Sequence, residues 1–169
     1  MVRLLLFLSL PLFILDFATK EWIVRRFDPP GVGGHESEVV IDGWFNIVRV
    51  HNTGIAFGMA NGTEGSNLLF GGVAAAALVL ITMLWRSNAF PTRVSRLAVA
   101  LLISGILGNL LDRITRHYVV DFLDFYYRKG GVERHFAAFN VADACICVSA
   151  ALLFFSAFQK TPTVKPADA

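Results

Sequence analysis

The sequence predicts an α-helical integral membrane protein with four transmembrane helices and a small extracytoplasmic β-sheet that forms a cradle at the membrane surface. Of its 169 residues, 55% are hydrophobic and only 17% are charged, whereas soluble domains average about 45–50% apolar and about 25% charged residues. Four apolar stretches are long enough, with their flanks, to cross a bilayer. The length suits one unit rather than two, so we expect a single membrane-embedded domain over residues 1–169.

The first apolar stretch predicts a span over residues 4–22. It resembles the start of a signal peptide, but no small-residue cleavage site follows Leu15 and the helical pattern continues to Trp22. We therefore expect it to be retained. Asp16 and Lys20 lie four residues apart with the acid first, the favourable order for an ion pair on one helix face. This pair is either a structural feature of the helix end, or it tethers the helix to a functional site or binds a lipid headgroup.

The first polar segment, residues 27–67, is predicted to be an extracytoplasmic loop that carries a small sheet. Residues 39–41 and 44–50 are rich in β-branched and aromatic side chains and flank an Asp-Gly turn, which indicates a hairpin. A sheet with open edges cannot lie within the hydrocarbon, because its unpaired N–H and C=O groups would find no partners there. We therefore expect the hairpin on the membrane surface. Residues 55–59 form a short apolar piece that could re-enter the interface.

Three further spans follow from apolar runs later in the chain. Residues 68–85 carry no charge over eighteen positions, which is the length expected of a transmembrane helix. Residues 97–113 and 137–158 predict the third and fourth spans. Residues 114–136 are predicted to be the second extracytoplasmic loop, and residues 160–169 a disordered tail.

Small residues within two of these spans predict where helices approach closely. Gly71 and Gly72 lie in the second span, and Ser104 and Gly108 lie four residues apart in the third. Such residues let helix backbones come into contact in a membrane.

Four spans place both termini on one side of the membrane and both long loops on the other. Counted from Lys20 and from Arg113, so that the adjoining helix ends are included, the long loops hold nine Lys and Arg residues, against six in the termini and the short connector at 86–96. A raw count therefore opposes cytoplasmic termini. The short connector contains no acidic residue and is given more weight, so we expect the termini in the cytoplasm and the site at the outer face.

Several classes of site and partner are disfavoured by the residues present. Cys145 and Cys147 do not share a helical face, and the four histidines show no metal-ligand spacing. Glycine-rich pieces lack the spacing of phosphate-binding loops. The net charge of +2 comes from dispersed basic residues, which argues against nucleic acid. We expect no metal and no organic cofactor.

Aspartates in or near the spans are the candidates for chemistry. There are five of them: Asp16, Asp112, Asp121, Asp124 and Asp143. Three have a basic residue four positions further on, the spacing of a helical ion pair: Asp16 with Lys20, Asp112 with Arg116 (and Arg113 beside it), and, if residues 121–128 are helical, Asp124 with Arg128. These three are expected to be paired groups.

Asp121 and Asp143 have no such local partner, and each could be the partner of the other. Asp143 lies near the mouth of the last span, where an ionisable group costs about 2.5–3.5 kcal/mol to insert, so a functional role is the default interpretation. Asn140 lies three residues earlier on the same face. Two carboxyl groups in one poorly solvated site share a proton, which supplies one base and one acid. The alternative, that each aspartate caps a helix or pairs with Arg113, stays open on these residues alone.

Two other classes of function are compatible with intramembrane acids. A small proton-coupled carrier would use the aspartates as relay groups and would predict internal repeats, which the sequence does not show. A non-enzymatic membrane scaffold would predict that replacing Asp121 and Asp143 by asparagine leaves function intact.

Five blocks of the sequence form an ordered set of motifs. They are Asp16–Lys20, Asn52–Phe57, Gly108–Arg113, Val119–Phe122 and Phe139–Asp143. In this order they resemble the lipoprotein signal peptidase family, the type II signal peptidases of bacterial inner membranes. The resemblance covers nearly the whole chain. The sequence departs from the family at Phe17, where Gln or Arg is usual, and at Ile55, which replaces an alanine, and this leaves the substrate contacts there open.

The resemblance implies that Asp121 and Asp143 are the catalytic dyad of an aspartyl peptidase. It also implies a set of supporting and substrate-binding residues: Asn52, Gly54, Asn109, Asp112, Arg113, Asn140, Asp16 and Lys20. Asn52 would hydrogen-bond the developing oxyanion or the substrate backbone. Arg113 would hold Asp112 or the carbonyl groups of the substrate.

The implied substrate is a diacylglyceryl-modified prolipoprotein, cleaved just before its lipidated cysteine. The implied enzyme needs no cofactor, contacts membrane lipid, and is a multi-pass monomer of the bacterial inner membrane. The surface sheet would cradle the substrate and shield the reacting carbonyl from bulk water.

Overall fold

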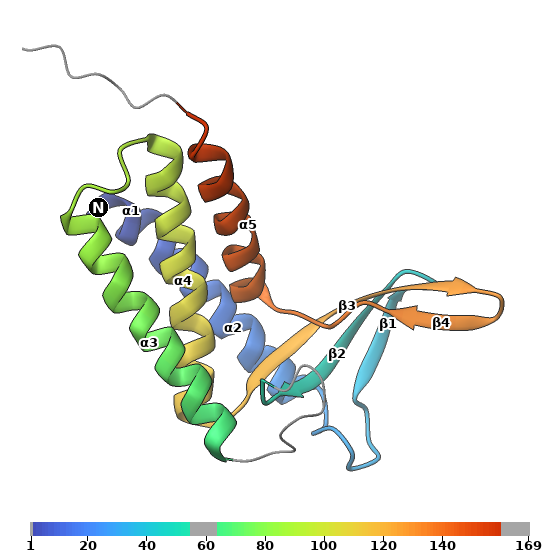
Figure 1. Ribbon diagram of the computed structural model, residues 1–169. Coiled ribbons are helices and arrows are strands. Elements are labelled where there is room, and N and C mark those ends of the chain that lie inside the picture. The colour runs from blue at the N-terminus through green and yellow to red at the C-terminus, as the bar shows by residue number, and fades with distance from the viewer. Residues whose placement is uncertain (1, 55–63, 160–169) are drawn as a thin grey trace, which may run out of the picture.

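The computed structural model describes residues 2–54 and 64–159. Figure 1 shows a bundle of helices from which a sheet projects at one end. The helical segments are α1 (Val2–Leu4), the π-helical η1 (Leu5–Ser9), α2 (Leu10–Arg26), α3 (Glu64–Arg86), α4 (Arg93–Arg116) and α5 (Val141–Ser156). The short apolar piece expected at 55–59 and the tail expected at 160–169 lie outside the described residues.

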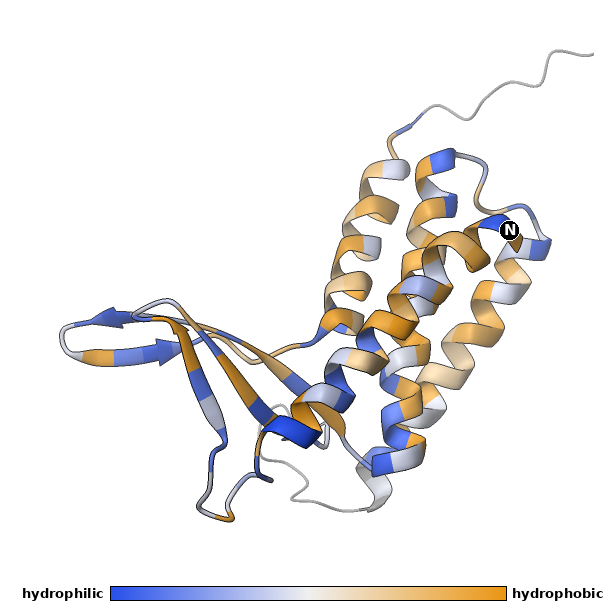
Figure 2. Cartoon of the chain, turned by 180° about the vertical axis from the view of Figure 1, so that it is seen from behind, coloured by the Kyte–Doolittle hydropathy of each residue, from blue (hydrophilic) through white to orange (hydrophobic). Residues whose placement is uncertain are grey.

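Three of the helical stretches are long and apolar enough to cross a membrane. They are Val2–Arg26, Asn67–Arg86 and Arg93–Arg116. Large apolar side chains such as Phe7, Leu68 and Phe154 are exposed on the bundle, and Figure 2 shows hydrophobic residues covering the helices. An exposed surface of this kind is expected where lipid replaces water. The prediction of long apolar helices in these three regions is confirmed.

The fourth apolar helix is shorter than predicted. α5 begins at Val141 and ends at Ser156, whereas the sequence indicated 137–158. Residues 136–139 are extended instead, and Phe139 N donates to Leu123 O at 3.1 Å. The capping box at Asn140 fixes where the helix begins, so the apolar residues before it pack beside the sheet.

The first helix is continuous from Val2 to Arg26 and runs past the predicted end at Trp22. Its end is closed by a side chain from the sheet, because Arg49 Nη1 donates to Val24 O at 3.1 Å and to Phe27 O at 2.7 Å. The last carbonyls of a helix need such partners, so this contact joins the helix end to the sheet.

The sheet is antiparallel, with its four strands in the order β1-β2-β3-β4. The strands are β1 (Ser37–Ile41), β2 (Phe45–Asn52), β3 (Val119–Lys129) and β4 (Val132–His135). The predicted hairpin at 39–41 and 44–50 is confirmed as β1 and β2. Gly43 in its turn has φ +77°, a conformation that favours glycine.

The second polar segment, predicted as a loop at 114–136, contains β3 and β4. The conditional helix over 121–128 is therefore wrong, because valine, phenylalanine and tyrosine favour a strand there. Asp124 accordingly does not pair with Arg128. His135 Nδ1 lies 2.9 Å from Asp124 Oδ2, and Arg128 pairs with Glu133.

A small apolar cluster joins the sheet to the first helix. Ile23 and Phe27 at the end of that helix pack against Val120 and Phe122 of β3. All four side chains are buried. This cluster fixes the start of β3, including position 121, against the bundle.

The close helix contact predicted at Gly108 of α4 is confirmed. A Cβ there would lie 2.5 Å from Asp16 Oδ2 of α2 and 3.1 Å from Ala142 Cβ of α5. Gly105, which was not among the predicted contact residues, is equally close to α5, because a Cβ there would collide with Ala142 O and lie 2.6 Å from Ile146 Cγ1. In α3 the expectation is wrong for Gly71 and Gly72, where a Cβ would meet nothing within 4 Å; Ala74 and Ala77 make the packing contact with α4 instead.

We expect Gly105→Ala to destabilise the protein by about 1–3 kcal/mol, because overpacking forces backbones apart. Gly71→Ala is the matched control in another spanning helix, and it should leave stability unchanged or slightly raised. Thermal unfolding of both purified variants in detergent measures the difference. Equal midpoints for the two variants would contradict the close contact between α4 and α5.

Candidate active site

Asp121 and Asp143 are brought together by the side chain and backbone of Asn140. Asn140 Nδ2 donates to Asp121 Oδ1 at 2.7 Å, and Asn140 N donates to Asp143 Oδ2 at 3.2 Å. Asp121 belongs to β3 and Asp143 to the first turn of α5. One residue therefore positions both carboxyl groups, although they come from a strand and a helix.

The local sequence explains why Asp143 lies where it does. Asn140 and Asp143 form a capping box, in which Asn140 Oδ1 also accepts from Asp143 N at 2.8 Å. The N-terminus of a helix stabilises a negative charge in its first turn. The helix-capping alternative thus describes part of the environment of Asp143, while Asp143 also contacts residues beyond its own helix.

Asn109 of α4 is the second amide that holds the pair. Its Nδ2 donates to Asp143 Oδ1 at 2.7 Å, and its Oδ1 accepts from Lys20 Nζ at 3.0 Å and from Asn140 Nδ2 at 3.2 Å. Because both donors approach the oxygen, the amide has one orientation and its N–H group faces Asp143. Asn109 is therefore fixed from three sides.

Asn52 at the end of β2 holds the other carboxyl group. Its Nδ2 donates to Asp121 Oδ2 at 2.8 Å, and its Oδ1 accepts from Gly54 N at 2.8 Å. Gly54 has φ +86°, and a Cβ there would collide with the ring of Phe70. Glycine is thus required at this position both by backbone conformation and by space.

Lys20 forms the charged centre beneath these amides. Its ammonium lies 2.8 Å from Asp16 Oδ2 and 3.1 Å from Asp112 Oδ2, with about 1–2% of each side chain exposed. Asp16 Oδ1 accepts from Ala142 N at 2.8 Å, and Asp112 Oδ2 accepts from Val120 N at 3.1 Å. The predicted ion pair of Asp16 and Lys20 is confirmed, and it tethers the first helix to α4, α5 and β3 rather than closing a helix end.

Arg113 does not hold Asp112, contrary to one expectation from the sequence. Arg116 and Lys20 pair with Asp112, while Arg113 Nη1 donates to Asn109 O at 3.2 Å. Arg113 also lies over the ring of Phe70, 5.5 Å from its centroid. Among the residues that the structure describes, Arg113 forms no salt bridge with an aspartate.

The environment of Asp121 disfavours its ionised form. Burial is the main cause, and the nearby charge of Asp143 adds to it; together they raise the pKa of Asp121 to about 7. Hydrogen bonds from Asn52 and Asn140 act in the opposite direction. A pKa of about 7 populates both the neutral and the ionised form of Asp121 near neutral pH.

Asp121 faces a cavity of about 330 Å³ on the side of the sheet. Asn52, Thr53, Ala137 and Ala138 line it together with Asp121. Ala137 and Ala138 were predicted to lie inside the fourth span, and their role was missed. The sequence signal that locates them is the capping box at Asn140, since a helix that begins there leaves residues 136–139 outside.

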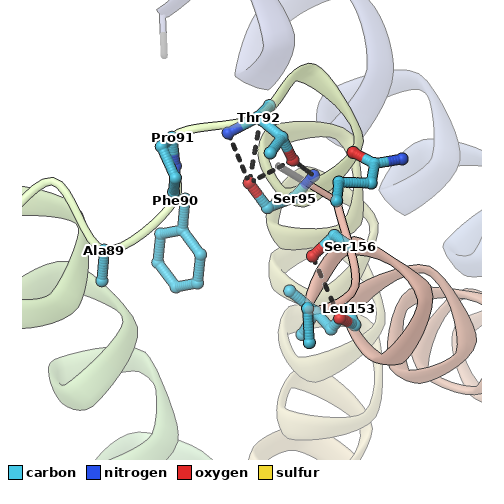
Figure 3. A pocket seen from close by; sticks show the side chains of 9 residues that line it. Ala89, Phe90, Pro91, Thr92, Ser95, Leu153 and Ser156 are labelled. Atoms are coloured by element: carbon cyan, nitrogen blue, oxygen red, sulfur yellow. Dashed lines mark hydrogen bonds between the residues drawn. The ribbon is translucent and has the colours of Figure 1, made fainter. Parts of the chain in front are cut away.

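A second cavity, of about 300 Å³, lies at the opposite end of the bundle (Figure 3). It is lined by Thr92 and Ser95 at the start of α4 and by Leu153 and Ser156 at the end of α5. Its lining contains no ionisable side chain, so it lacks the groups that acid–base chemistry requires. Over residues 2–54 and 64–159, His, Cys, Asp and Glu do not gather in threes or more to hold a metal ion. That the reaction needs no metal stays a prediction.

Comparison with known proteins identifies the family. Residues 8–159 match the family described as Signal peptidase (SPase) II. The chain belongs to the signal peptidase II family. It is thus an aspartic-type peptidase, a hydrolase that processes lipoproteins, and the carrier alternative has no support.

Individual relatives agree with this assignment. The peptidase is 40% identical to the lipoprotein signal peptidase of Shewanella sediminis over 86% of its length and 78% of that protein. It is 38% identical to the lipoprotein signal peptidase of Yersinia pestis over 90% of its length and 85% of that protein. A solved structure described as a bacterial membrane enzyme, at 2.3 Å resolution, matches 95% of the peptidase and 94% of its own chain, with 25% identity and a TM-score of 0.74.

We expect Lys20→Met to destabilise the peptidase by about 3–5 kcal/mol, because it leaves the buried carboxylate of Asp16 without a counter-charge and leaves Asp112 with Arg116 alone. Arg25→Met is the matched control. The side chain of Arg25 is 80% exposed and lies 3.6 Å from Glu21, so its loss should cost at most about 1 kcal/mol. Thermal unfolding in detergent compares them. If Lys20→Met unfolds at the same temperature as Arg25→Met, the ammonium is not what holds the helices together.

Proposed function

We propose that Asp121 and Asp143 are the catalytic dyad that cleaves diacylglyceryl-modified prolipoproteins just before the lipidated cysteine. The observation that carries the proposal is the bridge made by Asn140, which contacts both carboxyl groups. The raised pKa of Asp121 supports it, because an acid–base pair needs one proton near working pH.

The environments of the two groups suggest which of them holds the proton first. Burial and repulsion favour the neutral form of Asp121, whereas the N-terminus of α5 and the amide of Asn109 stabilise the charge on Asp143. We assign the proton to Asp121, which then donates a hydrogen bond to the scissile carbonyl oxygen. Asp143 takes a proton from water as the water attacks the carbonyl carbon.

The tetrahedral intermediate then collapses with the roles reversed. Asp143, now protonated, delivers its proton to the departing amine nitrogen as the C–N bond breaks. Asp121 takes back the proton that it shared with the oxyanion. Asn52 uses one N–H on Asp121 and has a second on the same nitrogen for the oxyanion.

The position of the site supports an outer-face enzyme with four spans. β3 and the start of α5, which carry Asp121 and Asp143, lie at the end of the bundle from which the sheet projects, and the N-terminus lies at the other end (Figure 1). α5 with its extended flank would form the fourth crossing, which places both termini in the cytoplasm of a bacterial inner membrane. Asn52, Asn109 and Asn140 of one chain hold the two aspartates, so we expect a monomer to suffice as the catalytic unit.

We expect Asp121→Asn and Asp143→Asn each to lower the cleavage rate by at least about 100-fold, because each removes one partner of acid–base catalysis. Asp42→Asn is the control, since Asp42 is an exposed turn residue. A gel-shift assay with a diacylglyceryl prolipoprotein in detergent reports loss of the signal peptide, and thermal unfolding verifies that each variant is folded. Full activity in either dyad variant would refute the assignment.

We expect the cleavage rate to fall as the pH rises above about 7. The folded protein holds a proton on Asp121 up to about that pH, and its loss removes the acid that polarises the carbonyl. The value of kcat/KM between pH 5 and pH 9 measures this limb, with unfolding temperatures recorded at each pH. A rate that keeps rising through pH 8 would show that the reaction needs no such proton.

A further inference from the structure

A groove separates the outer halves of α3 and α4. Gly71, Gly72 and Ala75 of α3 face Leu110 and Ile114 of α4 across it, and it encloses about 440 Å³. No side chain fills it at the two glycines, where a Cβ would meet nothing within 4 Å. In a spanning helix, close contact usually uses such glycines, but here they leave an apolar hollow.

One end of the groove is polar and the rest is apolar. Arg113 and His117 of α4 line that end, with Asn67 of α3 beside them. Asn67 Nδ2 donates to Arg113 O at 3.0 Å, which ties the two helices together there. Within the described residues, the Arg113 guanidinium makes one hydrogen bond, to Asn109 O, although an arginine has five N–H donors.

The polar end adjoins the two aspartates. Arg113 interacts electrostatically with Asp143 and Asp121, and Asn109, which accepts from Arg113 through its carbonyl, donates to Asp143. Arg113 also lies over Phe70, the ring that packs on Gly54 next to Asn52. A group bound at Arg113 would thus lie beside the residue that holds Asp121.

We propose that this groove binds one acyl chain of the diacylglyceryl group of the substrate, with Arg113 donating to an ester carbonyl oxygen. The inference rests on the proposed function, in which the lipidated residue directly follows the scissile bond. Its lipid must then leave the dyad through apolar space next to it. The groove meets that requirement, and the Arg113 guanidinium at its mouth has N–H donors beyond the one that, within residues 2–54 and 64–159, is used on Asn109 O.

The dimensions of the groove fit a single hydrocarbon chain. A separate hollow lined by Leu78 and Val79 lies one turn beyond Ala75 on the same face of α3. From Leu68 to Leu78 this hollowed face is about 15 Å long at about 1.5 Å per residue. One leaflet is half of a hydrocarbon core of about 30 Å. A signal-peptide helix, about 10–12 Å across with its side chains, is too wide for this volume.

Filling the groove tests the proposal. Gly71→Leu places a side chain in the groove. Val73→Phe is the control: position 73 lies about 200° around α3 from position 71, and Val73 is 58% exposed, so the added ring stays outside the groove. Two substrates that differ only in their acyl chains, dipalmitoyl and dioctanoyl, are compared by kcat/KM. We expect Gly71→Leu to lower the ratio of the long-chain to the short-chain value about tenfold, because the longer chain loses burial of several methylenes. Val73→Phe should leave the ratio unchanged.

Each other result has one meaning. An unchanged ratio in folded Gly71→Leu overturns the groove assignment while the cleavage itself upholds the proposed function. An equal change in Gly71→Leu for both substrates, dependent on the phospholipid added to the detergent, shows that a bilayer lipid occupies the groove and also overturns it. If the wild-type protein cleaves neither substrate, the proposed function is refuted, and the groove assignment that rests on it is refuted with it.

Discussion

A single buried ammonium holds this molecule together. Lys20 lies between Asp16 and Asp112, and the same ammonium donates to Asn109. Through the backbone N–H groups of Ala142 and Val120, the two carboxylates reach the start of α5 and the start of β3. Burying these charges costs several kcal/mol per ion unless every partner is in place, so the network enforces one arrangement of the elements that carry the site.

The amides above this centre connect it to the two aspartates that we propose as the dyad. Asn109 is oriented by Lys20 and contacts Asp143, and Asn140 contacts both Asp143 and Asp121. The chain of contacts runs from the buried ammonium to these amides and then to the two carboxyl groups. A site built in this way needs no movement of its own side chains to reach a working arrangement.

Much of this organisation is visible in the sequence, and the parts that are not have physical reasons. Hydropathy locates the apolar helices, and the i,i+4 spacing locates the pair of Asp16 and Lys20. The strand β3 was not predicted, because Asp121 and Asp124 within it resemble the charged residues of a loop. Both side chains are in fact buried by other elements of the fold. The start of α5 was misplaced because phenylalanines suit a span and a sheet edge equally well. Arg113 could not be placed, since no local spacing tells which of several carboxylates a long side chain reaches.

The spacing of the buried pair also bears on how the chain is made. Asp16 meets Ala142 only after the last helix has been synthesised, and Asp112 likewise comes late in the chain. Asp16 and Lys20 of the first helix therefore enter the bilayer before their partners in α4 and α5 have been made. Because Lys20 lies one turn after Asp16, the helix carries its own counter-charge during biosynthesis. Asp16 and Lys20 can thus enter the membrane as a neutral ion pair. Their contacts with Asp112 and Ala142 form later, once α4 and α5 have been inserted.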